Sequence, residues 1–387
     1  MKQVLLRGIT WNHSRALPPL VATAQRFEEQ HPGVRIQWEK RTLHEFGHAD
    51  ITTLADHFAL LVIDHPMAGD AETTGALTDL HPLLSSEERE DLQQDSMGPS
   101  FASYVYHNKL YALPIDAAAP AASLRPDLLN QCGLEEPKVW ADVISLARLG
   151  WVRMPAFSAD LFLNFMGLCV SLGSAVADSP EHLVDHEIGA RCLEQLHELA
   201  ALMPDEIYRM NPIALYERMA DEDTIAYCPF AYTYSNYSRN GFGAKHIQFS
   251  NPVALDKDTP MRTVLGGTGI AISAGCKDTA LALEYSLFVA GHTCQRTLYG
   301  ICGGQPARRS TWHDPLLNQI SDDFFSRTAA SIETAYVRPR YPGYVGLQER
   351  AGEAIVEYCR HHGNTQKTLQ QIDALYRASL REGIQHV

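Results

Sequence analysis

Residues 44–48 (HEFGH) match the HExxH pattern, in which two histidines one helical turn apart bind zinc and the glutamate activates a bound water. Such a site also needs a third protein ligand, and none follows at a suitable position in the sequence. Gly47 also falls within the five residues, and the segment is a short linker between two predicted strands. We therefore expect no metal site here, and no metal is predicted elsewhere.

A glycine-rich run at Gly266-Gly267-Thr268-Gly269 could in principle cradle a phosphate. The run lacks the Lys-Ser/Thr pair that completes a phosphate-binding loop, and no acidic residue follows at the spacing of a dinucleotide-binding fingerprint. A tight turn that offers backbone N–H groups to a ligand fits better. We therefore expect no nucleotide and no other cofactor.

Two further groups of residues could support covalent or acid–base chemistry. A nucleophilic cysteine needs a neighbouring base and a lowered pKa, and no motif around Cys228 or Cys302 supplies one, so packed thiols are favoured. Asp64 and His65 follow a predicted strand and could form an acid–base pair. An enzyme (a lyase, isomerase or transferase) therefore remains an alternative function, although no catalytic residue is assigned.

Length and charge restrict the class of protein. A chain of 387 residues exceeds what one hydrophobic core usually fills, so two lobes are expected. The formal net charge is −14, from 32 basic and 46 acidic residues, which argues against nucleic acid or an anionic membrane as partner. No apolar run is long enough for a membrane-spanning helix, so no membrane insertion is expected.

The first residues of the chain and the spacing of the cysteines bear on the cellular location of the protein. No apolar signal-peptide core follows Met1, and the eight cysteines are scattered without the spacing of a disulfide framework. Both features predict a cytoplasmic protein, or a periplasmic one if a signal peptide has been removed.

Hydrophobic patterns predict the elements that would position these residues. Strands are expected at residues 4–11, 34–40 and 58–64, with a helix at residues 15–30 between the first two. Strands that alternate with helices form a doubly wound parallel sheet, and ligands bind at the carboxyl ends of its strands. This places Trp11, Asn12 and His13 on the same rim as Asp64 and His65.

Residues 263–309 are the segment around which the chain is organised. The pattern predicts a strand, the Gly-Gly turn, a short strand at residues 270–273, an apolar helix from about residue 278, and a loop that ends in QPARR. Other ordered motifs are HPGV (31–34), GALTDLHP (75–82), YVYHNKLYALP (104–114) and RPRYPGY (338–344).

This ordered set resembles the extracellular solute-binding proteins of bacterial ABC importers, in their sugar-binding family 1. The resemblance implies a periplasmic-binding-protein-like type II fold: two doubly wound α/β lobes with a ligand cleft between them. We expect residues 1–113 and 266–312 to form the first lobe. Residues 114–265 and 313–387, with the C-terminal helices, would form the second.

The resemblance also implies a function. A monomer would bind a small polar ligand by hinge closure, as the substrate-binding component of an ABC transporter with a permease as partner. The ligand would be a sugar, a sugar-like compound or a carboxylated metabolite, because aromatic faces suit sugars while Arg308 and Arg309 could hold an anion. A cytoplasmic metabolite sensor is the further alternative. The predicted ligand-binding residues are Trp11, Asn12, His13, Asp64, His65, Asp116, Ser158, Tyr232, Gly266, Gly267, Thr268, Arg308 and Tyr344.

Overall fold

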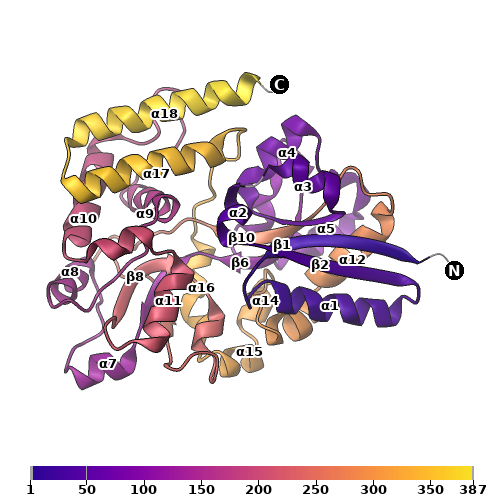
Figure 1. Cartoon of the computed structure of the whole chain (residues 1–387), viewed down its shortest axis with the longest axis horizontal. Coiled ribbons are helices and arrows are strands. Elements are labelled where there is room, and N and C mark those ends of the chain that lie inside the picture. The colour runs from indigo at the N-terminus through magenta and orange to yellow at the C-terminus, as the bar shows by residue number, and fades with distance from the viewer. Residues whose placement is uncertain (1–2, 49, 386–387) are drawn as a thin grey trace.

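The computed structural model describes residues 3–48 and 50–385, except for the side chains of residues 44, 48 and 383–385. Figure 1 shows two lobes side by side, with strands β6 (Leu113–Ala118) and β10 (Gly266–Ile272) near the junction between them. Within the described ranges, no helix is both long and apolar enough to cross a lipid bilayer.

The first lobe is built on a five-stranded sheet with the order β2-β1-β3-β10-β6. The three strands on one side of this sheet pair in parallel, and β10 runs antiparallel to both of its neighbours. These parallel strands are β1 (Val4–Trp11), β2 (Val34–Arg41) and β3 (Leu60–Ile63). Their bounds agree closely with the predicted ones, because alternating and continuous apolar runs are direct signatures of half-buried and buried strands.

Helices α1 (Leu17–Gln30) and α12 (Thr279–Ala290) pack together with this sheet. Phe27 of α1 meets Tyr285 of α12 edge to face, with 5.3 Å between ring centroids. Strand β3 lies in the centre of the sheet, and all four of its residues are buried, as a strand covered on both faces requires.

The second lobe contains a smaller sheet with the order β8-β7-β9, and its helices pack around two apolar clusters that both include residues of this sheet. The strands are β7 (Pro120–Leu124), β8 (Tyr227–Tyr232) and β9 (Gln248–Ser250). The predicted α/β class with two lobes is therefore confirmed. The strands of the second lobe, however, pair antiparallel. The prediction of a doubly wound parallel sheet therefore holds for the first lobe and is wrong for the second.

Strands β6 and β7 follow each other directly along the chain but belong to different sheets. Strand β6 pairs with β10 up to Ala118, and β7, which pairs with β8, begins at Pro120, so Ala119 joins the two sheets. The predicted Gly-Gly turn is wrong. Gly266 and Gly267 are the first two residues of a single strand, β10, and pair with β6. These glycines are extended because they pair with β6, and the local sequence does not reveal that partner.

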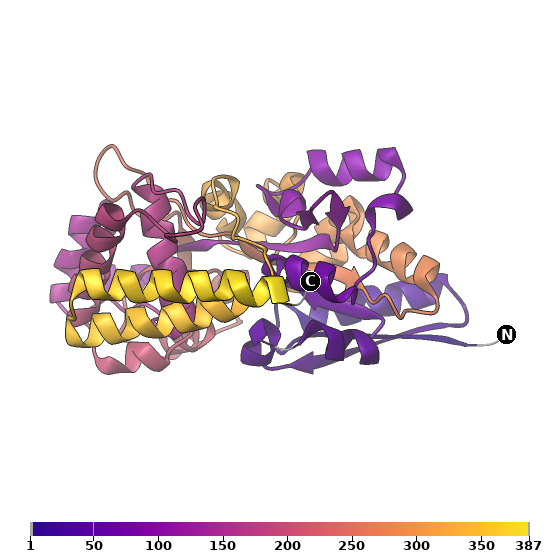
Figure 2. The ribbon, with the colours of Figure 1, turned by 90° about the horizontal axis from the view of Figure 1, so that it is seen from above.

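Helices α17 (Tyr344–His361) and α18 (Thr365–Gln385) close the chain as an antiparallel pair over the second lobe, as Figure 2 shows. Helix α17 lies directly on α9 (Ser158–Ser171): a Cβ atom added at Gly352 would lie 2.1 Å from the backbone oxygen of Ser158. These helices complete the wall of the second lobe behind the cleft.

Candidate functional site

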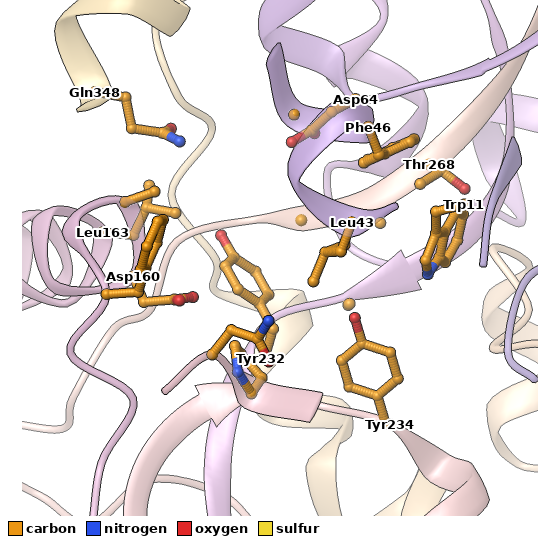
Figure 3. A pocket seen from close by; sticks show the side chains of 18 of the residues that line it. Trp11, Leu43, Phe46, Asp64, Asp160, Leu163, Tyr232, Tyr234, Thr268 and Gln348 are labelled. Carbon is orange, nitrogen blue, oxygen red and sulfur yellow. The ribbon is translucent and has the colours of Figure 1, made fainter. Parts of the chain in front are cut away.

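A cleft of about 330 Å³ opens between the two lobes and is lined from both. Figure 3 shows Asp160 and Leu163 of α9 on one side, facing Phe46, Asp64 and Trp11 of the first lobe. The remaining lining residues are Arg15, Leu43, Gly47, Ala118, Phe157, Ala159, Arg209, Asn211, Pro212, Tyr232, Tyr234, Gly266, Gly267, Thr268, Arg338 and Gln348.

The carboxyl ends of β1 and β3 bring Trp11 and Asp64 to the first-lobe wall, as the rule for parallel sheets predicts. Trp11 packs against Phe46 of α2 (Leu43–His48), with ring centroids 5.1 Å apart. The indole is 97% buried and its Nε1–H has no hydrogen-bond acceptor among the described residues. Thr268 Oγ1 on β10 is likewise buried without a described partner. Buried polar groups are normally satisfied, so both are ready to bond a ligand or a bound water.

Tyr232 and Tyr234 form the floor of the cleft at the end of β8. The Tyr232 hydroxyl donates to the backbone oxygen of Val264 at 3.1 Å, so this side chain offers its ring to the cleft. A Cβ atom added at Gly266 would lie 2.4 Å from the Tyr232 ring, which explains why glycine is needed beside it. Together with Trp11, Phe46 and Phe157, these rings give the cleft several aromatic faces.

The first buried ion pair at the cleft joins Arg15 to Asp116 of β6. Arg15 Nε donates to Asp116 Oδ2 at 2.9 Å, and Arg15 Nη2 donates to Asp116 Oδ1. Arg15 Nη1 donates to the backbone oxygen of Thr233 at 2.6 Å, so one side chain binds both lobes. The guanidinium also lies over the ring of Tyr234, 4.9 Å from its centroid.

A second ion pair joins Arg338 to Asp64, which lies on the first-lobe wall. Arg338 Nη2 donates to both carboxylate oxygens of Asp64 at 2.6 Å. Burial raises the pKa of Asp64, but the charge of Arg338 and the contact with His65 outweigh it, so the pKa lies below its usual range. Asp64 is therefore an anion whose charge is already compensated.

Asp160 is different because it has no hydrogen-bond or ion-pair partner in the part of the chain that the structure describes. It lies in the first turn of α9 and faces the cleft. Burial raises its pKa to about 7. A carboxyl group of this kind can accept hydrogen bonds from ligand hydroxyl groups as an anion and also donate one when protonated.

Residues 10–293 match the protein family described as bacterial extracellular solute-binding protein. This chain belongs to that family. The prediction of a solute-binding protein is thus confirmed, and the enzyme alternative is not favoured.

Three solved structures illustrate the similarity of the fold. The GacH receptor of Streptomyces glaucescens, solved unliganded and with acarbose, has 15% identity and a TM-score of 0.81, over 99% of this chain and 100% of that one. A solute-binding protein of Thermotoga lettingae bound to α-D-tagatose has 14% identity and a TM-score of 0.82, over 98% and 100%. One from Agrobacterium radiobacter with ribitol has 19% identity and a TM-score of 0.80, over 97% and 99%.

Six of the predicted ligand-binding residues of this solute-binding protein line the cleft: Trp11, Asp64, Tyr232, Gly266, Gly267 and Thr268. Their contact with a ligand stays a prediction. Three others lie immediately behind the wall. Asp116 is bound to Arg15, His65 is fully buried behind Asp64, and His13 packs edge-on against Tyr234 at 4.5 Å. Burial lowers the pKa of His13 to about 3 and that of His65 to about 4, so both rings are neutral.

The other four predicted residues do not line the cleft. Asn12 is exposed, Ser158 is buried beside α17, and Tyr344 is fully buried. Arg308 is also buried, and its guanidinium binds the backbone oxygens of Ala290 and Asp91 at 2.8 and 2.9 Å and the Asp91 carboxylate at 2.8 Å. Its positive charge therefore serves the packing of the first lobe and is not presented to a ligand in the cleft.

The sequence did not single out Arg15, Phe46, Asp160 or Arg338. Arg338 belongs to the RPRYPGY motif, and Asp160 precedes an apolar run that is typical of a buried helix, but neither pattern indicates what the side chain faces. Phe46 and Gly47 of the HExxH segment line the cleft, while the side chains of His44 and His48 lie outside the described residues. Burial raises the pKa of the Cys228 thiol to about 12, as expected for a packed cysteine.

Proposed function

We propose that this solute-binding protein binds a neutral, polyhydroxylated small molecule, a sugar or polyol, in the cleft between its lobes. The observation that carries the proposal is that both buried arginines at the cleft, Arg15 and Arg338, are already paired with carboxylates. An anionic ligand would have to compete with Asp116 or Asp64 for a guanidinium that already makes two hydrogen bonds to its carboxylate.

Asp160 favours a neutral ligand for a second reason. A carboxyl group without a partner in the described part of the chain would repel a bound carboxylate or phosphate. The same group is a good acceptor for sugar hydroxyl groups. Arg209 also lines the cleft, but it is exposed to solvent, which screens its charge.

The aromatic rings of the cleft support the same ligand class. Sugar rings present C–H faces that pack on aromatic surfaces, while their hydroxyl groups need planar or well-placed polar partners. Trp11 and Tyr232 supply faces, and Trp11 Nε1, Thr268 Oγ1 and Asp160 supply polar atoms without described partners. The acarbose, tagatose and ribitol bound to the three similar structures are of this chemical class.

We further propose that the protein acts as a monomer that closes on its ligand by a hinge motion and delivers it to an ABC transporter permease. Residues 1–118 and 266–312 would move as one lobe and the rest as the other. The family description places such proteins outside the cytoplasm. The scattered free cysteines had predicted a cytoplasmic location, and fractionation of the native cell would decide between the two.

The proposal is tested by a melting-temperature screen against neutral sugars, polyols, amino sugars and sugar acids. A ligand present at a hundred times its dissociation constant adds about 2.7 kcal/mol to stability, which is readily measured. We expect hits among neutral sugars or polyols, recovered unchanged by mass spectrometry and chromatography. Hits confined to sugar acids would contradict the neutral-ligand proposal, and a hit recovered as a new compound would indicate an enzyme.

A further inference from the structure

His182, His186 and Asp373 form a cluster in the second lobe, and none of the three lines the cleft. Asp373 lies on α18, His186 is the first residue of α10 (His186–Ala201), and His182 lies in the irregular segment that precedes α10. His182 Nδ1 and His186 Nε2 lie 2.7 and 2.6 Å from the same carboxylate oxygen, Asp373 Oδ2. All three potential ligand atoms lie within 4.8 Å of one another.

We propose that these three residues bind a divalent transition-metal ion of the zinc type. Two imidazole nitrogens and one carboxylate oxygen are ligands that zinc takes in sites with three protein ligands, where a water occupies the fourth position. Nitrogen ligands disfavour magnesium and calcium, which prefer oxygen.

The carboxylate of the cluster is held in place as a metal ligand requires. Asp373 is only 4% exposed, and its other oxygen, Oδ1, accepts a hydrogen bond from the backbone N–H of Leu183 at 3.0 Å. An outer hydrogen bond of this kind fixes the orientation of a ligand and so strengthens metal binding.

The histidines give the ion access from solvent. The side chain of His182 is 56% exposed and that of His186 is 31% exposed. Ligand atoms at zinc–nitrogen and zinc–oxygen distances of ~2.0–2.2 Å in a tetrahedral site lie roughly 3.3 Å apart. Each imidazole therefore has to retreat from Asp373 Oδ2 by about 0.6 Å, a shift that the exposed His182 can make by a small rotation.

The ion would connect helix α18 to the segment that precedes α10. Besides the contacts of Asp373 itself, two further hydrogen bonds already join them, from Tyr376 Oη to the Ser179 oxygen at 2.9 Å and from Arg377 Nη1 to the Glu181 oxygen at 2.8 Å. A metal ion held by residues from both segments stabilises the second lobe by binding the folded state alone. Affinity for the cleft ligand should not change.

The test uses the full chain without an affinity tag, stripped of metal with a chelator and then titrated with Zn²⁺ by calorimetry. We expect one saturable site per chain and a higher melting temperature with Zn²⁺ but not with Mg²⁺. Co²⁺, bound at the same site, should give the visible absorption of a tetrahedral complex.

The variant His182→Gln should lower zinc affinity at least about 100-fold, since loss of a direct ligand exceeds the 10–100-fold effect of an outer partner. His182 is exposed, so this variant should fold normally, and Asp373→Asn, which keeps an oxygen for Leu183, gives a second test. His361→Gln is the matched control, because His361 is exposed and lies 3.7 Å from Glu357 with no third convergent ligand among the described residues. The proposal would be overturned if the parent chain bound no zinc, or if His182→Gln bound zinc as tightly as the parent. The three residues would then form only a hydrogen-bonded cluster.

Discussion

At the scale of single residues, the indole N–H of Trp11 allows a direct test of the proposed ligand site. Its Nε1–H is buried at the cleft without an acceptor among the described residues, whereas the N–H of Trp38 donates to Tyr285 Oη at 3.1 Å. Trp11→Phe keeps an aromatic face and removes the donor. We expect it to weaken sugar binding about five- to tenfold, the worth of one hydrogen bond, with little loss of stability.

Trp38→Phe is the matched control for this experiment. It should lower the free energy of unfolding by about 1 kcal/mol and leave affinity unchanged, because its hydrogen bond lies away from the cleft. Calorimetric titration and chemical denaturation of both variants measure the two effects. Unchanged affinity in Trp11→Phe would show that the indole N–H does not bond the ligand.

Asp160 predicts a pH dependence of stability. Its pKa is raised to about 7 in the folded state by burial and is about 3.9 in an unfolded chain. The folded state therefore binds more protons between these values, so the contribution of Asp160 is fully present below about pH 4 and is lost as pH rises through 7.

Asp160→Asn removes this titration. Between about pH 4 and pH 7, the melting temperature of the ligand-free variant should rise relative to that of the parent. Above pH 7 it should stay higher. Melting curves at matched ionic strength measure the difference. Parallel curves across this range would mean that Asp160 titrates normally and is better solvated than the structure indicates.

At the scale of elements, the start of β10 depends on glycine for two separate reasons. Gly267 has a φ angle of +91°, and a Cβ atom there would lie 2.3 Å from the backbone oxygen of Asp116. Gly33 has a similar φ angle of +97° but nothing within 4 Å. The two positions therefore separate backbone strain from close packing.

Gly33→Ala should cost about 1–2 kcal/mol, the penalty for a left-handed backbone. Gly267→Ala should cost clearly more and should also weaken ligand binding, because β10 must move away from β6 and shift Thr268 in the cleft. Urea denaturation gives both values. Equal costs in the two variants would show that β10 relaxes without strain.

At the scale of the whole molecule, the two lobes are joined by short connections and by the side chain of Arg15, which bonds Asp116 in one lobe and Thr233 in the other. If the cleft closes on its ligand, the radius of gyration from X-ray scattering should fall when the sugar identified by the melting screen is added. A sugar that gives no melting shift is the control. A bound ligand with an unchanged radius would indicate a preformed, rigid site.

The sequence by itself determined the three parallel strands of the first lobe, the helix between the first two, and the family. Strand and helix periodicity are local properties, and the order of the motifs along the chain is a one-dimensional property, so both are visible without coordinates. It also determined the rim position of Trp11 and Asp64, because the carboxyl ends of parallel strands meet at one edge.

Only the tertiary structure decided which charges face the ligand. Arg15 and Asp116 are 101 residues apart, and Asp64 and Arg338 are 274 residues apart, so no local pattern reveals that they pair. The same holds for Arg308, which is satisfied inside the first lobe, and for the convergence of His182 and His186 on Asp373. The docking of distant segments fixes which polar groups are compensated, and the groups left over are those that the proposed ligand would meet.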